Sequence, residues 1–308
     1  SNQAADVLAL LELHLQRHTV QLRTGCTVST LRQSKGGYAV QFTTAEGGTE
    51  SLRADAVICA MGGAAGPQFG TDGSAFALAR MLGHSVAEPY PCLVPLRCAG
   101  FPVGLKGVRA NCALSLYLDG RCAGTERGEV QFAEYGLSGI PAMQLSCLLG
   151  PGVKKAGTSV DFFPEMAFPV LRGMLEQRCA SGMFASLETL LLGLVAKKLG
   201  HAILKSCGLQ PLSRAPGSLS RREVNALAGA LKNWRFAVEG TLPWTQAQVT
   251  GGGVPLAEVK TEGCASLRCP GLYLSGEVLD AAGDCGGFNL QWAWATGIAA
   301  GRAAARGL

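Results

Sequence analysis

The chain has 308 residues, of which 48% are hydrophobic and 16% charged, and it contains 42 glycines. Its length predicts about two domains or three small ones, and its apolar content excludes a disordered chain. The net charge of +5 comes mainly from residues 151–235, which carry twelve Lys or Arg and five Asp or Glu. These charges are interleaved with long apolar runs. This pattern favours a solvated helical face over a surface that binds nucleic acid.

The first part of the chain predicts a helix followed by short strands. Residues Gln3–His18 carry apolar side chains at helical spacing. The run Ala56–Ala60 is continuously apolar, which is typical of a strand buried on both faces of a parallel sheet. A helix is expected over Ser74–Leu82 and a strand over His84–Glu88. Between the first helix and the apolar run we expect four strands, the last three forming a β-meander because glycine pairs separate them: Val20–Arg23, Thr27–Gln33, Tyr38–Thr44 and Thr49–Arg53.

The middle of the chain has a different pattern. Short antiparallel strands are expected at Val108–Leu118, Arg121–Ala123 and Glu129–Phe132. From about residue 164 to 234, apolar stripes predict helices, in particular over Phe168–Leu175, Phe184–Leu194 and Val224–Leu231. The chain then returns to strand at Arg235–Glu239 and Leu272–Ser275, and it ends in an Ala- and Gly-rich helix over Asn289–Arg306.

This order of elements predicts one discontinuous α/β domain interrupted by two insertions. The α/β domain is expected to comprise residues 1–88 and 250–308. A β-rich module is expected from residues 89–163 and 235–249, and a helical module from residues 164–234.

The cysteines and the hydropathy indicate the cellular environment. The twelve cysteines form no Cys-x-x-Cys pair and no Cys/His cluster with metal-ligand spacing, so we expect reduced, mostly buried thiols in a cytoplasmic protein and no metal site. No run approaches the roughly 18 apolar residues of a spanning helix. Asp6 and Glu12 stand where a signal peptide would carry basic residues, so we expect neither export nor membrane association.

Three glycine clusters follow strands or precede helices, and each could bring backbone amides close to a phosphate. The cluster at 62–66 follows a buried strand, as a dinucleotide fingerprint does, and Glu88 lies at a plausible distance for a ribose contact. However, Met61 stands where the first glycine should be, and Pro67–Gly73 separate the cluster from the next helix. We therefore favour the interpretation that this cluster passes close to a cofactor that is bound mainly by other parts of the protein, over a true dinucleotide fingerprint. The other two clusters are Gly251–Gly253 and Gly283–Gly287.

The cluster at Gly283–Gly287 lies between a buried strand and a helix. The free amides at the start of that helix, together with its dipole, favour a partial negative charge such as a flavin pyrimidine carbonyl. Glu277 could accept hydrogen bonds from ribityl hydroxyls, and small residues such as Gly297 and Gly301 would let the helix lie close to the sheet. The alternative is an ordinary strand–loop–helix crossover with capping glycines, and composition does not separate the two.

The run from Gly271 to Asp280, continuing through Gly283–Gln291 into Trp292–Gly297, resembles the C-terminal signature of the BaiN/RdsA-type NAD(P)/FAD-dependent oxidoreductases, to which the aminoacetone oxidases look related. The resemblance implies an α/β fold with a two-dinucleotide-binding-type FAD domain, a β-rich, barrel-like substrate domain and a small helical domain. Further segments match in order over essentially the whole chain: Ser1–Leu8, Val57–Gly63, Gly83-His84, Pro91–Pro95, Gly136–Gly139 and Val249–Val254.

The resemblance also implies a function and a set of cofactor contacts. It implies hydride transfer between NAD(P)H, the flavin and a small organic acceptor or oxygen. No general acid or base is evident, and His84 is interpreted as structural. Cys285 is a candidate for a redox or substrate role near the ring and Ser138 for substrate contact, against simpler roles as an apolar filler and a turn residue. The FAD contacts are implied at positions that match the family motifs: Val28, Ala60, Gly62, Gly63, Gly276, Glu277, Asp280, Gly286, Gly287, Phe288 (where Tyr is more usual), Asn289, Leu290 and Gln291.

The chain departs from the family pattern at its start. The family's opening strand, glycine-rich turn and ribose-binding acidic residue do not precede Ser1, so the FAD domain is expected to be incomplete. We predict that the isolated chain binds FAD weakly, because each missing charge-assisted hydrogen bond is worth about 1.5–3 kcal/mol. The alternative function is that of a non-catalytic, cofactor-free remnant acting as a binding or scaffold module. As partners we expect a small-molecule substrate and no nucleic acid.

Overall fold

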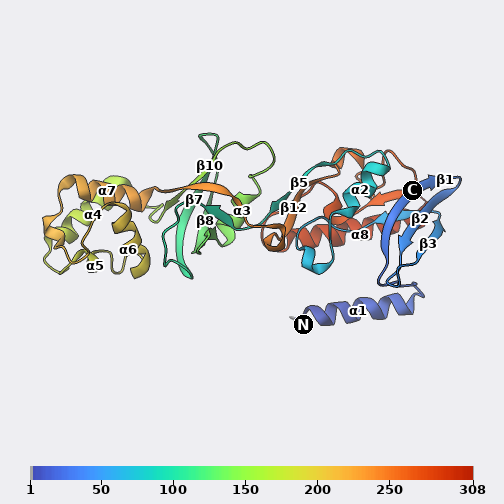
Figure 1. The fold of residues 1–308 in the computed structure, drawn as a ribbon, viewed down its shortest axis with the longest axis horizontal. Coiled ribbons are helices and arrows are strands. Elements are labelled where there is room, and N and C mark those ends of the chain that lie inside the picture. The colour runs from blue at the N-terminus through green and yellow to red at the C-terminus, as the bar shows by residue number, and fades with distance from the viewer. Residues whose placement is uncertain (1–2, 308) are drawn as a thin grey trace.

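The computed structural model describes residues 3–307 of the protein. The molecule is elongated, with a helical part at one end, a β-barrel in the middle and an α/β part at the other end (Figure 1). Segments from both ends of the chain meet in the α/β part, and residues 1–2 of the predicted opening motif lie outside the described residues. Short 3-10 helices occur at η1 (Pro67–Phe69), η2 (Pro216–Ser218), η3 (Trp244–Gln246), η4 (Leu256–Glu258) and η5 (Gly276–Val278).

The α/β part is built on two parallel strands from distant parts of the chain. Strand β4 (Val57–Cys59) pairs with β13 (Leu272–Leu274), with Val57 opposite Leu272. Helices α2 (Ser74–Met81) and α8 (Phe288–Arg306) complete this part. The three strands of the meander confirm the prediction and pair antiparallel in the order β1 (Thr27–Ser34), β2 (Gly37–Thr43) and β3 (Thr49–Ala54).

Several local predictions in this part are wrong. Residues 20–23 form no strand. Strand β4 is not buried on both faces, because Ile58 is 40% exposed. Strand β5 spans Ala87–Cys92 and so begins later than expected, because His84 is held instead by side-chain hydrogen bonds in a buried network.

The second glycine cluster forms a strand rather than a phosphate loop. Residues Gly251–Gly253 belong to β12 (Val249–Gly253), which pairs antiparallel with β5. A Cβ atom at Gly252 would overlap the carbonyl oxygen of Glu88, and one at Gly253 would lie 2.8 Å from the carbonyl oxygen of Val278. These glycines therefore permit close packing between backbones.

The barrel follows β5 in the chain and closes on itself. Along β11, the buried residues Trp234, Phe236 and Val238 alternate with exposed ones, as expected for a strand with one face toward a core. The two predicted strands between residues 121 and 132 are one long strand, because a single hairpin with β7 spans them. The strands in order around the barrel are β10 (Ala156–Asp161), β11 (Trp234–Thr241), β6 (Leu96–Cys98), β9 (Gly136–Ser138), β8 (Arg121–Phe132) and β7 (Val108–Leu118).

The helical part shares its core with the barrel. Barrel residues such as Phe132 and Trp234 belong to the same buried cluster as Leu171 and Leu231 of the helices. The predicted helix at 184–194 is wrong, because only a short helix forms there and a left-handed Gly193 (φ +78°) follows it. The helices are α4 (Phe168–Ala180), α5 (Leu187–Leu190), α6 (Lys197–Ser206) and α7 (Arg221–Lys232). Helix α6 lies in the region predicted to be helical, although no apolar stripe was singled out for it.

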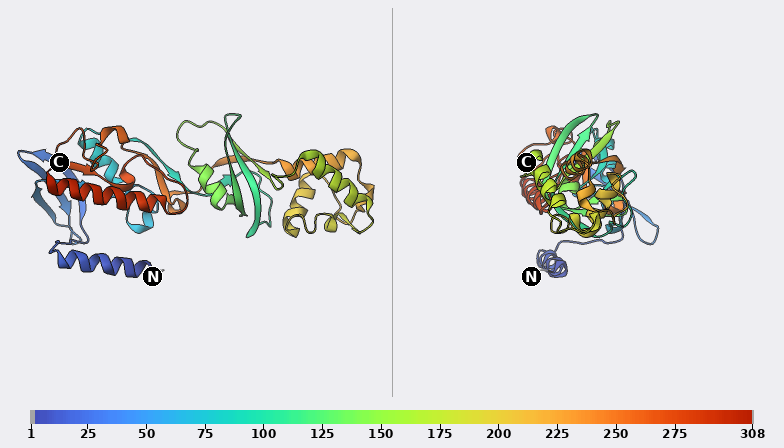
Figure 2. Two further views of the ribbon diagram at one scale, coloured as in Figure 1. Left: turned by 180° about the vertical axis from the view of Figure 1, so that it is seen from behind. Right: turned by 90° about the vertical axis from the view of Figure 1, so that its left-hand side faces the viewer.

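Helix α1 (Ala4–Arg17) confirms the first predicted element, but it lies apart from the rest of the molecule (Figure 2). It contains no buried residue, and Val7, Leu8 and Leu11 are among its exposed apolar side chains. Among the described residues, no helix combines the length and apolar character needed to cross a bilayer.

Candidate cofactor site

A cavity of about 240 Å³ lies beside the C-terminal motif. Its wall comes from three separate stretches: Leu93 after β5, residues 248–249 at the start of β12, and residues 277–293. The lining residues are Leu93, Gln248, Val249, Glu277, Ala281, Asp284, Cys285, Gly286, Gly287, Asn289, Leu290, Trp292 and Ala293.

The N-terminus of α8 opens onto this cavity. Gly286 (φ +121°) and Gly287 (φ +93°) occupy conformations that favour glycine, and Gly287 is the N-cap residue of the helix. Since no side chain caps the helix, its first amides remain available for an acceptor. Asn289 instead braces the loop, accepting a hydrogen bond from the Gly283 amide (2.8 Å) and donating one to the Gly283 carbonyl (2.9 Å).

Glu277 is fixed at the cavity wall by β12. Its Oε1 accepts a hydrogen bond from the Thr250 amide at 2.9 Å. Burial raises the pKa of the Glu277 carboxyl, and the hydrogen bonds from Thr250 oppose that shift. The Thr250 hydroxyl also accepts hydrogen bonds from the amides of Ala64 (2.8 Å) and Ala65 (3.0 Å). Thr250 therefore joins the first glycine cluster to the C-terminal motif.

Gly63 has no room for a side chain at this junction. A Cβ atom there would overlap Thr250 Oγ1 and lie 2.5 Å from Glu277 Oε1. The glycine is therefore required by close packing against the carboxylate that lines the cavity.

Hydrogen bonds also attach α8 to the turn at Gly276. The Trp292 indole donates to the Gly276 carbonyl (3.1 Å), and the Gly276 amide donates to Thr296 Oγ1 (2.9 Å). The predicted role of Gly297 and Gly301 in close helix packing is wrong, because a Cβ atom at either position would meet nothing within 4 Å. The close approach occurs at Gly263, where a Cβ atom would overlap that of Ala303.

The barrel side of the molecule contributes Gln144, which the sequence analysis did not identify. Gln144 lies in α3 (Ile140–Ser146), directly after barrel strand β9. Its side chain donates a hydrogen bond to the Asp284 carboxylate and accepts one from the Cys285 amide (3.0 Å). The loop that lines the cavity is thus held from the barrel side, and no local pattern in the sequence marks such a contact.

The structure brings some of the sequence-predicted residues together at the cavity and leaves others apart. Ser138 lies in β9 opposite Gln131 and outside the cavity lining, and Val28 packs against the core of the α/β part. Those lining the cavity are Glu277, Cys285, Gly286, Gly287, Asn289 and Leu290. Two more, Gly63 and Gly276, contact lining residues. The remaining predicted residues, Ala60, Gly62, Asp280, Phe288 and Gln291, do not line it.

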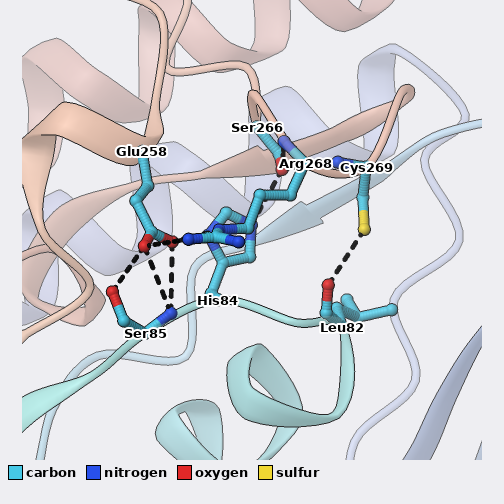
Figure 3. A network of polar contacts seen from close by, with 7 residues as sticks. All are labelled: Leu82, His84, Ser85, Glu258, Ser266, Arg268 and Cys269. Carbon is cyan, nitrogen blue, oxygen red and sulfur yellow. Dashed lines mark hydrogen bonds and ion pairs between the residues drawn. The ribbon is translucent and has the colours of Figure 1, made fainter.

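His84 occupies a buried polar network away from this cavity (Figure 3). Its Nδ1 lies 2.7 Å from Glu258 Oε2 and its Nε2 lies 2.8 Å from Ser266 Oγ. The order Ser–His–Glu resembles a catalytic triad, but the Glu258 carboxylate also binds Arg268 and Ser85. The Ser266 hydroxyl also accepts two backbone hydrogen bonds. The network joins η4 to the chain just before β5, in agreement with the structural role expected for His84.

The chemistry of the cavity suits the ring of a flavin better than a whole dinucleotide. Free helix amides can donate to ring acceptors, a carboxylate can accept from hydroxyl groups, and Leu93, Val249 and Leu290 provide apolar surface. The volume is below the range of about 300–1,000 Å³ that is typical of drug-sized ligands. Among the described residues, no group of three or more His, Cys, Asp or Glu is arranged to hold a metal ion.

Comparison with known proteins assigns the family. The model of the HI0933-like protein Rossmann domain matches residues 1–303. The chain belongs to this family. Among curated proteins, the 3-dehydro-bile acid delta(4,6)-reductase of Clostridium scindens is 38% identical over 310 residues, covering 99% of this chain and 74% of the relative.

Two further relatives are ribosomal RNA dihydrouridine synthases. The enzyme of Haemophilus influenzae is 25% identical over 96% of this chain and 71% of its own length. The Escherichia coli enzyme is 26% identical over 96% of this chain and 70% of its own length. These matches confirm the family resemblance predicted from the motifs, and the reductase from Clostridium scindens supports the prediction of an oxidoreductase.

Proposed function

We propose that the protein is a FAD-dependent reductase that transfers hydride from NAD(P)H through the flavin to a small organic acceptor. The observation that carries the proposal is the cavity formed by the family's C-terminal motif, where the uncapped start of α8 and a partly buried carboxylate line the same wall. The domain boundaries expected from the sequence belong to this proposal, with residues 1–88 and 250–308 holding most of the cofactor and the barrel covering the substrate. Leu93 and Val249 of the cavity wall lie at the edges of the β-rich module as the sequence bounds it.

The proposal gives each part of the site a task. A bound flavin would supply a ring that accepts and donates hydride. The α8 amides would bind the edge of the ring where negative charge develops, and Glu277 would accept hydrogen bonds from hydroxyl groups of the cofactor. Leu93 and Val249 would exclude water, while Gln144 would hold the loop that carries Cys285.

The acceptor is proposed to be a small unsaturated organic molecule. The names of both kinds of relative describe addition of hydrogen to the substrate, and the relative at 38% identity acts on a bile-acid derivative. RNA is the second candidate, because two relatives act on ribosomal RNA and residues 151–235 carry an excess of seven positive charges.

The test follows flavin-dependent oxidation of NADH and NADPH by the full chain under anaerobic conditions with excess FAD. We expect oxidation above that of free FAD, and faster oxidation with a small enone than with transcribed ribosomal RNA fragments. Faster oxidation with RNA would show that RNA, and not a small organic molecule, is the acceptor. The absence of protein-dependent oxidation at any FAD concentration would instead favour a cofactor-free binding or scaffold module.

The variant Gly63→Ala tests whether the flavin binds in the described cavity. Because the added methyl group collides with Thr250 and Glu277, we expect the flavin-dependent rate to fall at least tenfold, about 1.4 kcal/mol. The control is Gly173→Ala, where a Cβ atom meets nothing within 4 Å. Equal rates for the two variants would contradict the assignment.

A further inference from the structure

Three cysteines from separate elements meet beside the cavity. Cys92 ends β5 and is fully buried, Cys147 follows α3 and is half-buried, and Cys285 lies in the loop before α8. Cys92 belongs to a small buried cluster against which both Cys147 and Cys285 pack. The cluster borders the cavity, because Cys285 and Leu93 line its wall.

The environments of Cys92 and Cys147 differ in a way that suits a reactive pair. The Leu93 amide donates a hydrogen bond to Cys147 Sγ at 3.4 Å. Hydrogen bonding from Cys92, supported by this amide, lowers the pKa of Cys147 to about 7, and the same hydrogen bond followed by burial raises the pKa of Cys92. Of the two thiols, Cys147 is therefore the one that loses its proton more readily.

Ordinary core cysteines in the same chain behave differently. Burial raises the pKa of Cys98 and of Cys112 to about 12, which makes them unreactive thiols. Cys147 combines partial exposure, a sulfur that accepts a hydrogen bond from the Leu93 amide, and packing against the cluster that contains the Cys92 thiol. These three properties together are typical of the attacking cysteine in thiol–disulfide exchange.

We propose that Cys147 and Cys92 form a redox-active dithiol that reduces small organic disulfides at the edge of the cavity. The Cys147 thiol loses its proton, and the resulting thiolate attacks one sulfur of the disulfide RSSR. The S–S bond breaks, and the released thiolate takes up a proton to become RSH. The Cys92 thiol then loses its proton and attacks Cys147 Sγ, which forms the Cys92–Cys147 disulfide and releases a second RSH. The protein loses two electrons and two protons, and RSSR gains them. This step does not depend on the proposed flavin chemistry.

The test uses the reduced full chain, glutathione disulfide as the probe, alkylation of the remaining thiols and tryptic mapping without reduction. Cys92 is the sole cysteine of the tryptic peptide 81–97, and Cys147 is the sole cysteine of the peptide 128–154. We expect these two peptides to become linked, and dithiothreitol to separate them. Cys285 lies in a different peptide, 269–302, so a link from that peptide to Cys147 would overturn the proposed pairing.

Two variants distinguish the cysteine that attacks the disulfide substrate from the cysteine that resolves the mixed disulfide. We expect Cys92→Ala to accumulate glutathione on Cys147, and Cys147→Ser to form neither this adduct nor a disulfide at Cys92. The matched control Cys122→Ser removes an exposed thiol and should leave the linked peptides unchanged. The proposal is overturned if the native chain forms no 81–97/128–154 link, if the link appears only in denaturant, or if Cys147→Ser leaves the oxidation of Cys92 intact.

Discussion

At the scale of single residues, the buried polar groups show most clearly how this fold is specified. Glu258 accepts hydrogen bonds from Arg268 at 2.8 and 2.7 Å and contacts His84 and Ser85. This network connects η4 with the chain just before β5, two segments far apart in the sequence. Because a buried polar group without a partner costs about 1–3 kcal/mol, such a network favours one arrangement of these segments.

Substitution of Glu258 should therefore reduce stability in a pH-dependent way. The Arg268 guanidinium, assisted by Ser85 and His84, lowers the pKa of Glu258 from 4.5 to about 2. The charged carboxylate thus stabilises the folded state above pH 4.5, and this contribution disappears as the pH falls toward 2. We expect Glu258→Gln to lower the free energy of unfolding at pH 7 by about 2 kcal/mol, with a smaller difference from the native chain near pH 3, as measured by urea denaturation.

The control for this substitution is an exposed ion pair. Glu134 lies 3.6 Å from Lys106, and both side chains are largely exposed, so Glu134→Gln should change the stability by less than about 1 kcal/mol. Equal effects of the two substitutions at pH 7 would show that the network does not stabilise the fold.

At the scale of secondary structure, the sequence predicted elements with strong local patterns and failed where packing determines the ends. Helices α1 and α2 and the meander followed from periodicity and glycine pairs. The apolar run at 184–194 does not show that only a short helix forms, because buried leucines occur in the turns that follow the helix as well as in the helix itself. Helix α3 was missed because its short sequence is fixed by packing on β8 and by Pro141 in its first turn.

Helix α7 has a local start signal that can be tested. The Ser220 hydroxyl accepts a hydrogen bond from the Glu223 amide, and the Glu223 carboxylate accepts one from the Ser220 amide, which forms a capping box. We expect Ser220→Ala to lower the free energy of unfolding by about 1 kcal/mol. Ser186, the N-cap of α5, makes no such bond, so Ser186→Ala should have little effect. Similar losses of stability for both variants would contradict the role of the capping box.

At the scale of the whole molecule, the candidate site depends on contacts that no local pattern contains. The family signature predicted five residues of the cavity wall: Glu277, Gly286, Gly287, Asn289 and Leu290. Thr250 and Gln144 were missed as parts of the site, because their roles arise only when β12 and α3 lie against the motif. The sequence thus predicted one wall of the site, while the pairing of distant segments supplies the rest.

The most direct test asks whether this cavity binds the ring of a flavin. Riboflavin is a suitable probe because it carries the ring and the ribityl chain without phosphates. Ala293 lines the cavity, whereas Ala295, two residues further along α8, lines a different one. In a fluorescence titration we predict that the native chain and Ala295→Phe quench riboflavin with similar dissociation constants, and that Ala293→Phe weakens binding at least tenfold. Equal binding by Ala293→Phe and the native chain, or no binding by the native chain, would contradict the account.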